Sequence, residues 1–113
     1  FEAIATIAEK LDSIPEAGGT MLDNTVFVYL ASNGGAHHSQ EGNFPIMLLG
    51  NLGGKLKQGH FYAPGNSNDK DDDTQTRVGD VWATLLAAAG QPHKEFGIPR
   101  NGIGYKPIEE LLA

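Results

Sequence analysis

Apolar positions recur at helical spacing in two segments of the chain. Residues 1–12 carry such positions at Ile4, Ile7, Ala8 and Leu11. Residues 76–90 carry them at Val78, Val81, Trp82, Leu85, Leu86 and Ala89. Each pattern predicts an amphipathic helix, because residues three and four apart share one helix face. Thr76 is placed to cap the second helix, and Gly90 followed by Pro92 is typical of a helix end.

Two other segments are continuously apolar and predict strands. Residues 25–32 read TVFVYLAS and residues 44–50 read FPIMLLG. Runs of this kind, without alternation, are typical of strands that are buried on both faces, as in a parallel sheet. Residues 51–65 combine turn-forming glycines with short alternation, which indicates a hairpin or an excursion at the sheet edge. Pro107, with acidic residues behind it, predicts that a short helix begins near the end of the chain.

These elements predict an α/β fold in a single domain of residues 1–113. We expect a partial three-layer sandwich, in which helices flank a short, mostly parallel sheet with a hairpin excursion. Two central strands are few for such a sheet, so further strands must come from the hairpin, from the rest of a larger protein or from a second copy of the chain. The last alternative predicts a homo-oligomer that forms through sheet edges. Because the chain begins at Phe1 and not at Met, we interpret it as a trimmed chain or as a piece of a longer protein.

The composition of the chain argues against two classes of binding partner, nucleic acids and membranes. The net charge is −6, and the basic residues are dispersed along the chain, which argues against nucleic-acid binding. No apolar run approaches the roughly 18 residues that a membrane span requires, and no signal peptide is visible. The absence of cysteine excludes disulfides and thiolate metal sites. We therefore expect neither a nucleic-acid nor a membrane partner.

The segment SNGGAHHSQEGN, residues 32–43, is the strongest candidate for chemistry. It follows directly on the first predicted strand, and ligands of α/β sheets gather beyond the carboxyl ends of strands. Its candidate metal ligands are Asn33, His37, His38 and Glu41. Imidazole nitrogen and carboxylate oxygen suit zinc, manganese or iron. His38 and Glu41 form the better-spaced pair, because the side chains of adjacent histidines diverge. A solvated turn with surface histidines is the other interpretation.

A second acidic segment has a different candidate chemistry. Residues 69–80, DKDDDTQTRVGD, carry acidic residues at positions 1, 3, 5 and 12 of a calcium-loop pattern. The sixth position lacks the glycine of that pattern, and Asp80 replaces the usual glutamate at the twelfth. A solvated acidic loop before a helix explains the segment equally well. His60 and His93 are isolated, and we expect them at the surface. No serine stands in a nucleophile-elbow motif.

Three stretches together resemble a known family. They read EKLDSIPEAGGTMLDNTVFVYLAS, FPIMLLGNLGGKLKQGHFY and VGDVWATLLAAAGQPHKEFG, with the Gly/His-rich loop between the first and the second. In this order they resemble the C-terminal part of the domain of unknown function 1552 family, exported proteins of planctomycetes and related marine bacteria. That family is distantly similar to the alkaline phosphatase and sulfatase superfamily. The resemblance covers nearly all of the chain.

The resemblance implies a parent protein that hydrolyses phosphate or sulfate esters with divalent metal ions and is exported, for example to the periplasm. In that superfamily the loop after the strand matching TVFVYLAS carries metal ligands. Asn33 stands where an acidic residue is usual, His37 and His38 lie in the histidine-bearing part, and Glu41 is the remaining strong ligand. The cofactor implied is zinc, manganese or calcium.

Two hypotheses about function follow. In the first, the chain is a fragment or remnant of this hydrolase-like protein. It would not be catalytically complete alone, because the nucleophile and the first metal ligand of the superfamily belong to an N-terminal half that this chain lacks. In the second, it is a non-catalytic interaction module that associates with itself through sheet edges.

Overall fold

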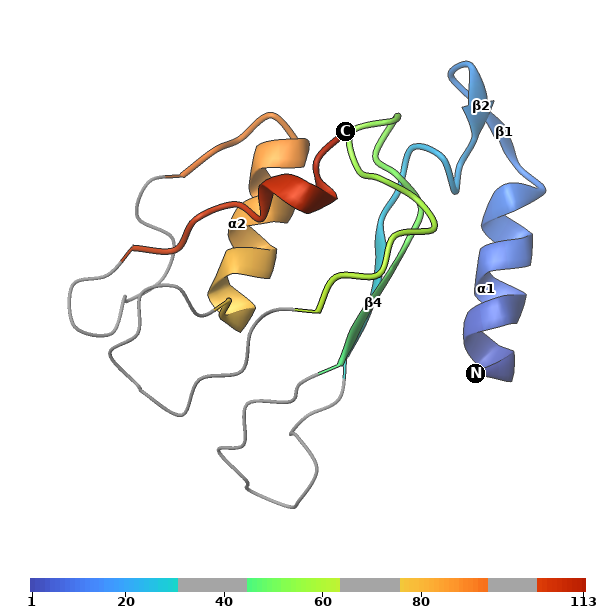
Figure 1. Cartoon of the computed structure of the whole chain (residues 1–113). Coiled ribbons are helices and arrows are strands. Elements are labelled where there is room, and N and C mark those ends of the chain that lie inside the picture. The colour runs from blue at the N-terminus through green and yellow to red at the C-terminus, as the bar shows by residue number, and fades with distance from the viewer. Residues whose placement is uncertain (31–44, 64–75, 94–103) are drawn as a thin grey trace.

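The computed structural model describes residues 1–30, 45–63, 76–93 and 104–113. Figure 1 shows two helices on either side of a narrow sheet. The elements are α1 (Glu2–Asp12), β1 (Pro15–Glu16), β2 (Gly19–Thr20), β3 (Phe27–Leu30), β4 (Ile46–Leu49), α2 (Val78–Ala88) and the 3₁₀ turn η2 (Glu109–Leu111). Both helices and both strands that the apolar patterns predict are therefore present.

The sheet of β3 and β4 corrects the predicted fold class. The two strands are antiparallel, with Phe27 opposite Leu49 and Leu30 opposite Ile46. β1 and β2 form another antiparallel pair, so the mostly parallel sheet of a partial three-layer sandwich is wrong for the described residues. Continuous apolar runs do not fix the direction of a strand. The predicted burial on both faces is also wrong for β3, because Tyr29 and Leu30 are exposed. Here α1 and α2 lie on opposite sides of an antiparallel pair (Figure 1).

Gly50 directly follows β4, and backbone atoms of the turn before β3 pack tightly around it. It is buried, with a φ of +90°. A Cβ atom built on it would overlap the carbonyl oxygen of Thr25 and lie 2.6 Å from that of Leu22. The following turn is held by the amide of Gly53, which donates to the carbonyl oxygen of Asp23 at 2.7 Å. Only glycine fits both this conformation and this space.

The two helices differ in how deeply they are buried. Four residues of α2 are buried, namely Val81, Ala83, Thr84 and Ala88, and none of α1 is. The other buried hydrophobic residues of the described part are Leu56 and Ile108. The core therefore lies on the α2 side of the hairpin. On the other side, the rings of Phe1 and Tyr29 are in contact, with centroids 5.8 Å apart.

The last eight residues of the chain differ from the prediction. In place of the helix that Pro107 predicts there is one turn, Glu109–Leu111. The predicted hairpin of residues 51–65 has no internal strand pairing within its described part. Instead Leu56 bridges Leu112 in an antiparallel sense. The amide of Lys57 donates to the carbonyl oxygen of Leu111 at 2.9 Å, beside this bridge.

Candidate functional site

The predicted metal ligands Asn33, His37, His38 and Glu41 lie outside the described residues. Leu30 and Ile46, described residues that flank them in the sequence, are register partners in the hairpin. Within the described ranges, no group of three or more His, Asp or Glu side chains is placed to hold a metal ion. His60 and His93 are exposed, as expected of surface histidines.

Asp80, the last residue of the calcium-like segment, has a structural role in this fold. One carboxylate oxygen, Oδ2, accepts a hydrogen bond of 2.7 Å from the amide of Arg77, directly before α2. The other, Oδ1, accepts one of 2.8 Å from the amide of Lys106. The negative charge also lies at the positive end of the helix dipole. Asp80 thus satisfies one backbone donor at the start of α2 and another in the C-terminal segment.

Thr76 does not cap α2, contrary to the prediction. Its hydroxyl lies 2.7 Å from the hydroxyl of Tyr62 and shares a hydrogen bond with it. The helix instead begins after Arg77, and the carboxylate of Asp80 in its first turn bonds back to the Arg77 amide. The sequence carries a signal for this arrangement. In a capping box, an acidic or amide residue stands three positions after the N-cap residue, as Asp80 stands after Arg77.

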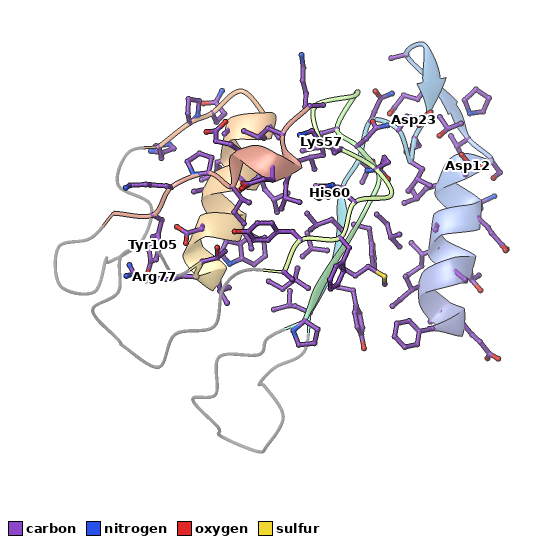
Figure 2. All side chains as sticks on the ribbon, in the orientation of Figure 1. Asp12, Asp23, Lys57, His60, Arg77 and Tyr105 are labelled. Carbon is purple, nitrogen blue, oxygen red and sulfur yellow. The ribbon has the colours of Figure 1, made fainter. Side chains whose placement is uncertain are left out.

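Thr84 forms a second link between α2 and the C-terminal segment. The residue is fully buried. Its hydroxyl donates to the carbonyl oxygen of Asp80 at 2.6 Å and accepts a hydrogen bond of 2.8 Å from the amide of Ile108. We call the four residues Asp80, Thr84, Lys106 and Ile108 the α2 clasp. Figure 2 shows the C-terminal segment lying along α2 where the clasp forms.

A third polar cluster joins α1 to the turn before β3 (Figure 2). The hydroxyl of Thr20 lies 3.2 Å from Oδ1 of Asp12 and 3.1 Å from Oδ2 of Asp23. Because that hydroxyl has one proton, it donates to one carboxylate at a time. Oδ2 of Asp23 also accepts the amide of Thr20 at 2.9 Å. These contacts fix a local turn.

The outer edges of the hairpin and the α1 side of the molecule remain uncovered in the described structure. Neither β3 nor β4 pairs with a further described strand. The large hydrophobic residues that stay exposed are Phe1, Ile7, Tyr29, Leu30, Phe61 and Val78. Phe1 and Tyr29 are in ring contact, whereas Leu30, the next residue of β3, projects from the opposite face of the strand.

Comparison of the chain with protein-family models, with curated proteins and with solved structures finds no match. Among the described residues, no helix has the length and apolar character needed to cross a membrane.

Proposed function

We propose that this chain is one part of a larger alkaline phosphatase/sulfatase-like domain and is not a complete catalyst alone. The observation that carries this proposal is the two-stranded sheet of β3 and β4, whose outer edges have no described partner. A two-stranded hairpin is marginal by itself and gains stability from further strands or packing. The type of domain is taken from the family resemblance of the sequence, whose three stretches include β3, β4 and α2.

The chemistry of such a domain is metal-assisted hydrolysis of phosphate or sulfate esters. A bound divalent metal ion would polarise the ester oxygen and stabilise the developing negative charge. This chain would contribute Asn33, His37, His38 and Glu41 as ligands. Imidazole and carboxylate ligands, of which His38 and Glu41 are the better-spaced pair, suit zinc or manganese better than calcium, which prefers oxygen ligands. The Leu30–Ile46 pairing supports the proposal, since a segment closed at its ends loses less entropy when its side chains converge on one ion.

Metal content tests the ligand assignment. We expect protein purified without chelator to hold roughly one zinc or manganese ion per chain, as a single mononuclear site would. The double variant His37→Ala/His38→Ala should lose that metal in elemental analysis. The matched control is His60→Ala/His93→Ala, which removes two exposed histidines elsewhere and should keep it. Metal absent from every preparation, or equal in both variants, would contradict the assignment.

Hydrogen–deuterium exchange tests whether the chain is part of a larger domain. The comparison is between this chain alone and the protein made from the entire reading frame that contains it. We expect the amides of β3 and β4 to exchange at least about 10-fold more slowly in the longer protein, because outer-edge amides there gain hydrogen-bond partners. The amides of α2, which are already bonded within the helix, should change less.

The rival function is a self-associating interaction module. It predicts that the isolated chain has the mass of a dimer or higher oligomer in solution and that its β3 and β4 amides are protected without any added sequence. The isolated chain could instead be a monomer whose hairpin amides exchange as slowly as they do in the longer protein. That result would contradict both the larger-domain proposal and the rival.

A further inference from the structure

We draw no further inference here: the strongest candidate, the surface patch between α1 and β3 where the exposed rings of Phe1 and Tyr29 are in contact, carries none, because nothing in the described part of the structure shows what covers it.

Discussion

Replacing Gly50 by alanine is expected to disrupt the end of the β3–β4 hairpin and to lower the free energy of unfolding by about 4 kcal/mol. Two costs combine in this change. The backbone has a φ of +90°, which side chains other than glycine rarely adopt, and the added methyl group would overlap the carbonyl oxygen of Thr25. Strain and overpacking each cost about 1–3 kcal/mol. Urea unfolding, followed by circular dichroism and by the fluorescence of Trp82, measures the loss.

Gly54→Ala is the matched control for this experiment. Gly54 has a similar φ of +83°, but nothing lies within 4 Å of a Cβ atom built there. The control should therefore show only the conformational cost, about 1 kcal/mol. The difference between the two variants isolates the crowding at Gly50. Equal losses would show that the carbonyl groups of Leu22 and Thr25 move aside at little cost.

The second large effect is expected for Asp80→Ala. The substitution leaves the amides of Arg77 and Lys106 without their acceptor and removes a negative charge from the start of α2. Loss of a helix cap costs about 1 kcal/mol, and hydrogen bonds to a charged group contribute about 1.5–3 kcal/mol. We expect a total loss of about 3 kcal/mol in urea unfolding. Exchange of the Lys106 and Ile108 amides should accelerate with it, since both belong to the α2 clasp.

Two further variants show whether the loss comes from the clasp. Asp80→Asn keeps one acceptor oxygen and should lose about half as much stability, since only one charge-assisted bond can be replaced by a neutral one. Glu9→Gln removes an exposed acidic charge from α1 and should change stability by less than about 0.5 kcal/mol. An unchanged exchange rate at Lys106 in Asp80→Ala would disprove the proposed link between α2 and the C-terminal segment.

Periodicity was sufficient to locate the main elements of this fold. The spacing of Ile4, Ala8 and Leu11 predicts α1 because a helix face repeats every three to four residues. Gly90, with its φ of +75°, follows Ala89, the C-cap of α2, as expected of a glycine at a helix end. Strand direction was not predictable in this way. An apolar run can form a strand whether its neighbour is parallel or antiparallel, so the pairing of Leu30 with Ile46 required the structure.

The long-range polar contacts could not be predicted from the sequence, for a different reason. Asp80 and Lys106 are 26 residues apart, and their bond uses a backbone amide, which every residue other than proline carries. No side-chain pattern marks such a pair. The same holds for the hydroxyl of Thr84, whose acceptor role is visible only when Ile108 is placed beside it. The metal ligands Asn33, His37, His38 and Glu41 remain predictions from sequence.

The α2 clasp also has a consequence for synthesis of the protein on the ribosome. Ile108 belongs to the small set of buried residues, and Leu112 pairs with Leu56, so the core is incomplete until residues 104–113 have emerged. Contacts between segments so distant in sequence form late, because a long loop must close first. Until then the apolar face of α2 is exposed on a nascent chain. That interval is when the polypeptide is most open to chaperone binding and to aggregation.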